Sequence, residues 1–191
     1  MPAGRWGCPL MRLRFTTADQ VFQAFPTAGE DIEHVPLAME PVAYLGLLQA
    51  SKTPEDAIGF CAYLLSKLDA VWWACQAIRE IQAPLSEEDD HLIGLAEAWY
   101  SEPGEVHRQQ ALTEGMAAVE NGPAAWAALA AGWSGGSLLA EPNAPVPPAN
   151  FLTAQAVRAA VLTAIALKPA RERRAHLDQA IGLAQRMLEQ A

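Results

Sequence analysis

The chain has 191 residues, a hydrophobic content of 51% and no long polar tract, so it can bury a substantial core as one domain. The chain is acidic, with a formal charge of −9 and a pI of about 4.8. This negative charge would repel phosphate groups, and no stripe of basic residues offsets it. Nucleic acid and anionic membrane surfaces are therefore poor partners. No run of about 18 apolar residues occurs, so membrane insertion is not expected.

The N-terminal segment, residues 1–16, has no hydrophobic periodicity and is expected to be irregular. It lacks the apolar core of a signal peptide, which favours a cytoplasmic protein, and Met11 is an alternative start to Met1. The cysteines form no CxxC motif, which argues against a disulfide framework and against a zinc site; they are Cys8, Cys61 and Cys75.

In the next part of the chain, the sequence predicts helices over residues 17–25, 41–50 and 53–67. Residues 26–39, between the first two helices, are predicted to form a loop. The loop is acidic and contains prolines. The clearest start signal is Thr53, a preferred N-cap residue, followed by Pro54 at the first helical position.

A pair of adjacent tryptophans, Trp72 and Trp73, marks the following predicted helix, residues 69–81. Neighbouring residues on a helix point about 100° apart, so the two indoles fall on either side of the polar face that carries Arg79. The helix is therefore covered on more than one side, or it presents an indole to a partner. A very short turn predicts an antiparallel hairpin with helix 53–67. In that hairpin Cys61 and Cys75 would face each other, either as buried hydrophobic residues or as a redox pair.

Five further helices follow, near residues 86–102, 105–120, 123–133, 153–167 and 170–189. The second of them has a predicted inward row of Leu112, Gly115, Met116 and Val119. Between helices 123–133 and 153–167, residues 134–150 carry four prolines and predict an extended connector, ordered against the helices. The sequence thus predicts an all-α domain over residues 17–191. Its eight or nine helices form either a repeat-like array of antiparallel pairs or an orthogonal bundle.

No catalytic, metal or cofactor motif emerges, which favours a role other than that of an enzyme. His91 lies one turn after Glu87, but further zinc ligands are not apparent, and an exposed histidine in an acidic first turn explains it better. Ser134 and Ser137 bracket two glycines, yet a phosphate loop or nucleophile turn needs a preceding strand and a following helix. Termination of a helix is the better interpretation.

Four segments together resemble an uncharacterised bacterial family of about this length: Ala70-Val-Trp-Trp-Ala-Cys75, Trp133-Ser-Gly-Gly-Ser-Leu138, Val146-Pro-Pro148 and Leu152-Thr-Ala-Gln-Ala-Val157. The resemblance covers most of the chain from about residue 50. It implies an all-helical bacterial cytoplasmic protein without assigned activity, loosely associated with type VI secretion gene clusters, and it contributes no catalytic residue.

Two functions are consistent with these patterns. The first is a non-catalytic interaction protein, an adaptor or accessory component whose partner is another protein. Tryptophan is enriched at binding hot spots, so the candidate contact residues are Trp72, Trp73, Arg79, Trp133, Leu138 and Leu139. The alternative is a small-molecule-binding protein or enzyme with a tryptophan-lined pocket between helices. For Trp72 and Trp73, burial of the indole in the core is favoured over a role in binding.

Overall fold

The structure is a computed structural model that describes residues 14–118, 122–138 and 145–189. These residues form ten α-helices and no strand, so the all-α prediction is confirmed. The helices are α1 (Ala18–Ala24), α2 (Ala28–Asp31), α3 (Pro41–Gln49), α4 (Glu55–Leu64), α5 (Lys67–Gln82), α6 (Glu87–Ser101), α7 (Glu105–Ala117), α8 (Pro123–Gly132), α9 (Leu152–Ala166) and α10 (Arg173–Glu189). A short 3-10 helix, η1 (Ala170–Glu172), precedes α10.

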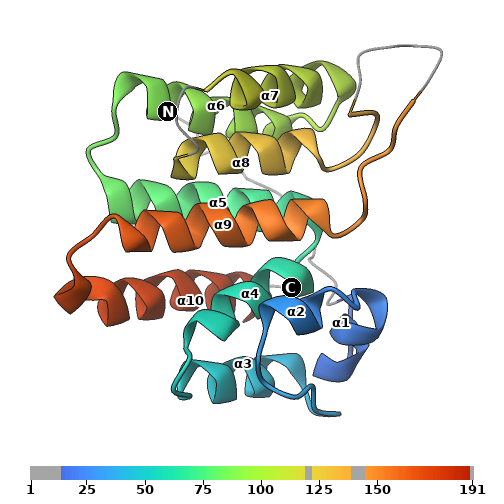
Figure 1. The fold of residues 1–191 in the computed structure, drawn as a ribbon, viewed down its shortest axis with the longest axis vertical. Helices are drawn as coiled ribbons and strands as arrows, with labels where there is room; N and C mark the ends of the chain where they lie inside the picture. Colours follow the sequence, from blue (N-terminus) through green and yellow to red (C-terminus); the bar gives the residue numbers. More distant parts are fainter. Residues whose placement is uncertain (1–13, 119–121, 139–144, 190–191) are drawn as a thin grey trace, which may run out of the picture.

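The helices stack in layers, which Figure 1 shows edge-on. α6 and α7 lie at the top of that view, α8 lies beneath them, and α5 and α9 run side by side across the middle. Below them are α10 and α4, and α1 to α3 complete the lower end. Because α9 contacts α4, α5, α8 and α10, it links the upper layers to the lower ones.

Most helix boundaries follow the local sequence signals. The hydroxyls of Ser66 and Ser86 accept hydrogen bonds from the backbone N–H groups of Asp69 and Asp89, which caps α5 and α6. The short helix α2 lies inside the predicted loop 26–39. It has only four residues, which is too few to produce a periodic apolar pattern.

The predicted hairpin of α4 and α5 is wrong. Leu65 and Ser66, which join the two helices, have extended backbone angles with ψ of 155° and 158°. Two extended residues redirect the chain without reversing it, so α4 and α5 meet only near their junction, and α4 packs on α3, α9 and α10. Cys61 and Cys75 are both buried free thiols, and burial raises the pKa of each.

The predicted inward rows are largely buried, including Ile58, Cys61, Ala62 and Leu65 of the α4 segment and Val157, Ala160, Val161 and Ala164 of α9. Met116 of α7 is an exception, because 67% of it is exposed. Leu112 and Gly115 face α8, and the next residue along the helix turns about 100° further round, toward solvent. Val119, the last residue of that predicted row, lies outside the described residues.

α8 is enclosed on nearly all sides, because every residue in it except Trp126 is buried. It lies between the α6–α7 layer and the α5–α9 layer, so it is apolar on all sides and built mainly from alanine. Its small side chains allow α7 to approach closely. In the part of the chain that the structure describes, no helix is long and apolar enough to cross a membrane.

Candidate interaction surface

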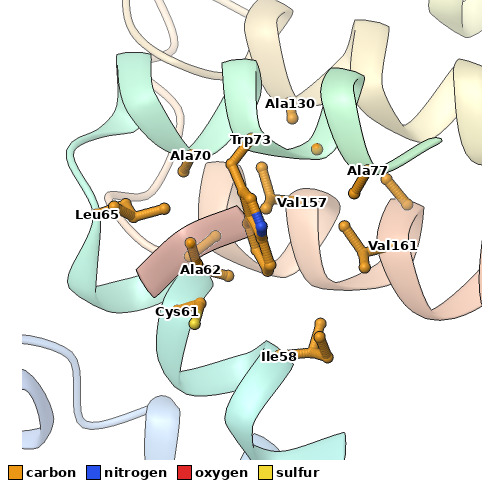
Figure 2. Close-up of a cluster of buried hydrophobic side chains, with 14 of the residues drawn as sticks. Ile58, Cys61, Ala62, Leu65, Ala70, Trp73, Ala77, Ala130, Val157 and Val161 are labelled. Atoms are coloured by element: carbon orange, nitrogen blue, oxygen red, sulfur yellow. The ribbon is translucent and has the colours of Figure 1, made fainter. Parts of the chain in front are cut away.

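Trp73 lies in the core. It is fully buried, and Figure 2 shows its indole between Ile58 and Ala62 of α4 and Val157 and Val161 of α9. The indole Nε1 donates a hydrogen bond to the backbone carbonyl of Ala180 in α10, at 2.9 Å. The apolar rings of Trp73 are buried and its polar atom is hydrogen-bonded inside the protein. Its side chain is therefore inaccessible to a partner, and Trp73 is no longer a candidate contact residue.

Trp72 points to the other side of α5 and is half-buried. Its ring stacks on that of Tyr100 in α6, with a centroid separation of 4.6 Å and an interplanar angle of 16°. α5 and α6 are consecutive and antiparallel, so the start of α5 meets the end of α6. The stack places two large, partly exposed aromatic rings side by side on the outer surface of the bundle.

Arg79 lies two turns further along the same side of α5 and joins it to α6. Its Nε and Nη2 donate to the two carboxylate oxygens of Glu97 at 2.7 and 2.9 Å, and Nη1 donates to Asp90 Oδ1 at 2.6 Å. Gln76 Nε2 also donates to Glu97, at 3.3 Å. The hydrogen bonds to Glu97, partly offset by burial, raise the pKa of Arg79, and about a third of its side chain (34%) stays exposed. Bidentate pairing of this kind holds the guanidinium in one orientation.

We call the surface formed by Trp72, Gln76, Arg79, Glu97 and Tyr100 the α5–α6 face. A shallow pocket of about 260 Å³ continues it at the turn between the two helices, lined by Arg79, Ala83, Leu85, Ser86, Glu87 and Asp90. A tryptophan-lined pocket would have favoured the small-molecule hypothesis. No tryptophan lines this one.

The predicted connector residues occupy a different part of the surface. Trp133, just after α8, is half-buried and meets Trp126 edge to face, with centroids 6.3 Å apart. Leu138 is also half-buried, and its N–H donates to the carbonyl of Val146 at 2.8 Å, so the two described ends of the connector lie side by side. Leu139 lies outside the described residues. In the described part of the chain, no hydrogen bond or ring contact joins this group to Trp72.

Three side chains from different helices hold the end of α8 and the start of the connector. Arg108 of α7 donates through Nη1 to the carbonyl of Gly132 and through Nη2 to that of Ser137, the latter at 3.1 Å. Lys67 of α5 donates to the carbonyl of Ser134 at 2.9 Å, and Thr153 of α9 donates to that of Trp133 at 3.1 Å. These donors satisfy carbonyl groups that the end of a helix leaves without partners.

Sequence reasoning missed Tyr100 and Arg108. Tyr100 follows Trp99 in the chain, so the two residues form a second aromatic doublet, Trp99-Tyr100, which could have been matched with Trp72-Trp73. Arg108 carried no such signal, because an arginine between Glu105 and Gln109 is typical of a solvated helix face. It is nevertheless buried. Only the approach of α8 and the connector encloses it.

The structure gives structural roles to the residues that the sequence offered as a zinc ligand, a phosphate loop or a nucleophile turn. His91 Nε2 lies 2.5 Å from Glu114 Oε2 on α7, so its partner is on the neighbouring helix and is not Glu87. Gly136, between Ser134 and Ser137, has a φ of 63°, which suits glycine and turns the chain away from α8. Among the described residues, no group of three or more His, Cys, Asp or Glu side chains is arranged to hold a metal ion.

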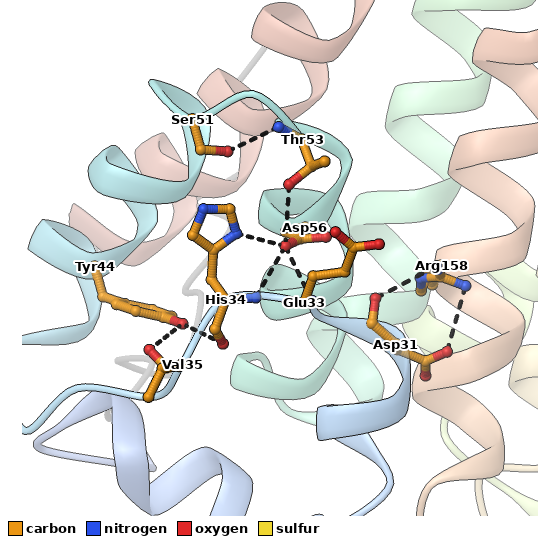
Figure 3. A network of polar contacts seen from close by, with 9 residues as sticks. All are labelled: Asp31, Glu33, His34, Val35, Tyr44, Ser51, Thr53, Asp56 and Arg158. Carbon is orange, nitrogen blue, oxygen red and sulfur yellow. Dashed lines mark hydrogen bonds and ion pairs between the residues drawn. The ribbon is translucent and has the colours of Figure 1, made fainter.

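A separate polar cluster, shown in Figure 3, centres on the buried Asp56 of α4. Its Oδ2 accepts from the backbone N–H groups of Glu33 and His34 at 3.1 and 3.3 Å and lies 2.7 Å from His34 Nδ1. Tyr44 donates to the carbonyls of His34 and Val35, and burial, followed by the charge of Asp56, raises its pKa to about 12. The cluster ties the chain between α2 and α3 to the start of α4.

The comparisons with known proteins place the chain in a family. Neither the curated proteins nor the solved structures contain a match to it. The sequence profile of a family of unknown function, DUF6931, matches residues 44–188, which include α4 to α9 in full, most of α3 and all of α10 except its last residue. These residues also contain the whole α5–α6 face. The chain therefore belongs to this family of unknown function, DUF6931.

Proposed function

We propose that this protein is a non-catalytic adaptor or accessory protein that binds another protein through the α5–α6 face. The observation that carries the proposal is the partly exposed stack of Trp72 on Tyr100, at a centroid separation of 4.6 Å. Tryptophan, tyrosine and arginine are the residues most enriched at binding hot spots, and this face has one of each, with Arg79 two turns from Trp72.

The rigidity of the face also supports a binding role. The rings restrain each other by stacking, and Arg79 is held by both oxygens of Glu97 and by Asp90. A partner therefore meets side chains that are already ordered, so association loses little side-chain entropy. The acidic charge of the chain favours a protein partner over a nucleic acid.

The proposal includes a cytoplasmic location and an accessory role beside a bacterial type VI secretion system. Support for both comes from the resemblance carried by the segments around Trp72 and Trp133.

The test is capture of the partner from bacterial cells that encode this chain, followed by measurement of its affinity with purified components. We expect Trp72→Ala and Tyr100→Ala each to weaken binding about tenfold or more, because each removes a ring from the stack. Leu47→Ala is the matched control. Leu47 is an exposed apolar residue (42%) on α3, at the opposite end of the molecule from α6.

Equal binding by Trp72→Ala and Leu47→Ala would contradict the assignment of the α5–α6 face. Saturable binding of a metabolite that is lost in Arg79→Ala, together with the lack of any protein partner, would favour the small-molecule alternative through the pocket beside Arg79.

A further inference from the structure

The connector ends in a proline-rich segment that neither the helical packing nor the α5–α6 face uses. It reads Pro145-Val-Pro-Pro148 and is followed by Ala149 and Asn150, just before α9. Residues 145–149 adopt no helix, strand or turn, and Figure 1 shows them as an orange trace at the edge of the molecule leading to α9. Four of these five residues are exposed, and Pro148 is half-buried.

The covalent chemistry of the segment favours one conformation. A proline ring holds φ near −65°, and a residue that precedes proline is excluded from the helical region. Val146 and Pro147 both precede a proline, so the run favours the left-handed polyproline II helix, which has three residues per turn. Pro145 and Pro148 are three residues apart and therefore lie on the same side of such a helix.

The rest of the protein holds this segment in place. The carbonyl of Val146 accepts from the N–H of Leu138 at 2.8 Å, and the N–H of Val146 donates to Ser137 Oγ at 3.0 Å. The carbonyl of Ser137 is in turn bound by the buried Arg108. Beyond the prolines, the carbonyl of Ala149 accepts from Leu152 at the start of α9. The segment is thus anchored at both ends.

Between these anchors the segment presents what polyproline-binding domains recognise. Val146 is 43% exposed, and Pro145 and Pro147 are exposed beside it. The carbonyls of Pro147 and Pro148 accept no hydrogen bond from the part of the chain that the structure describes, which leaves them available to donors on a partner. A segment that is already extended and anchored loses little entropy when it is bound.

We infer that residues 145–149 form a second binding element, a polyproline ligand for a partner domain whose groove is lined by aromatic side chains. The proline rings and Val146 would pack between the aromatic rings, and tryptophan or tyrosine side chains of the groove would donate to the free carbonyls. No side chain in this segment is charged, so recognition depends on shape and hydrogen bonding. This inference is independent of the α5–α6 face.

The test uses the full chain and two ¹⁵N-labelled probe domains with tryptophan-containing grooves, an SH3 domain and a WW domain. We expect the chain to cause saturable shifts of the groove tryptophan indole signal in at least one probe. The triple variant Pro145→Ala, Pro147→Ala, Pro148→Ala should weaken that binding at least about tenfold. Its melting temperature shows whether the fold is intact.

Val146→Asp is the second variant. It keeps all the prolines and the N–H that donates to Ser137, and it places a charge where the groove is apolar, so we expect a similar loss of affinity. Trp72→Ala should bind the probe as the unaltered chain does, which separates this inference from the proposed function. Three results would overturn the inference. They are no saturable shift in either probe, binding by the triple variant or by Val146→Asp as tight as that of the unaltered chain, and loss of binding in Trp72→Ala.

Discussion

Trp72 and Trp73 are neighbours in the chain and occupy different environments, because one helical step of about 100° separates them. Trp73 points between α4, α9 and α10 and uses its only polar atom inside the protein. Trp72 points outward and stacks on Tyr100. The same residue type therefore contributes mainly to folding at one position and to the exposed surface at the next.

We predict that Trp73→Ala lowers the free energy of unfolding by roughly 3–5 kcal/mol, as expected when a fully buried tryptophan is truncated. Trp72→Ala should cost clearly less, because its ring keeps one side toward solvent and leaves no closed cavity. Urea unfolding followed by far-UV circular dichroism gives both values. A larger loss for Trp72→Ala than for Trp73→Ala would show that the outer ring is the more important for stability.

The second prediction concerns Glu105, whose carboxylate accepts from Arg108 at 2.6 and 2.8 Å. Hydrogen bonds from Arg108, and then from Gln109, lower the pKa of Glu105 to about 2. A pKa that is lower in the folded state stabilises the protein above the unfolded value, near 4.5, and that stabilisation is lost as the pH falls toward 2. The side chain is 61% exposed, so the effect is expected to be modest.

The measurement is the free energy of unfolding of the unaltered chain and of Glu105→Gln between pH 6 and pH 2. We expect the unaltered chain to be the more stable at pH 6 and the difference to shrink as the pH falls. Glu88→Gln, which removes an equal charge from an exposed position on α6, controls for net charge. A difference that is constant over the whole range would rule out a contribution from ionised Glu105.

At the scale of elements, the contact between α7 and α8 depends on a glycine. A Cβ atom added to Gly132 would lie 2.7 Å from both Cα and Cβ of Leu112 on α7, which is closer than such atoms approach in proteins. Because one of these atoms belongs to the backbone, rotation of a side chain cannot relieve the clash. α8 sits at the centre of the stack, so a displacement there would also reach α6 and α9.

We therefore predict that Gly132→Ala destabilises the protein by about 1–3 kcal/mol, the usual range for overpacking. Gly94→Ala is the matched control in α6, where an added Cβ meets no atom within 4 Å. The control should raise stability by about 0.5–1 kcal/mol, because alanine is the better helix former. The two melting temperatures should shift in opposite directions, and equal shifts would show that α7 and α8 tolerate a wider spacing.

Across the whole molecule, α9 is the element that joins the layers, since it contacts α8 and α5 above and α4 and α10 below. We predict that residues 17–191 unfold as a single domain in one cooperative transition. Far-UV circular dichroism, which reports all the helices, and near-UV circular dichroism, which reports the buried aromatic rings, should give the same urea midpoint. Two separate midpoints would instead show that the chain contains two domains.

The sequence by itself determined the all-α class and the position of nearly every helix, because caps, prolines and apolar periodicity act over a few neighbouring residues. It also identified the inward rows of α4 and α9. It could not show that α4 and α5 fail to form a hairpin, since the angle at Leu65 and Ser66 depends on the helices that α4 packs against.

The same limit applies to the candidate surface. Periodicity placed Trp72 and Trp73 at the two edges of one polar face. Only the positions of α6 and α10 decided that Trp72 stacks on the partly exposed ring of Tyr100 and that Trp73 enters the core. Arg108 became a buried anchor for the connector because α8 ends beside it. Burial is a property of the elements that assemble around a residue, so it is decided by tertiary packing and not by the residue's immediate neighbours in the chain.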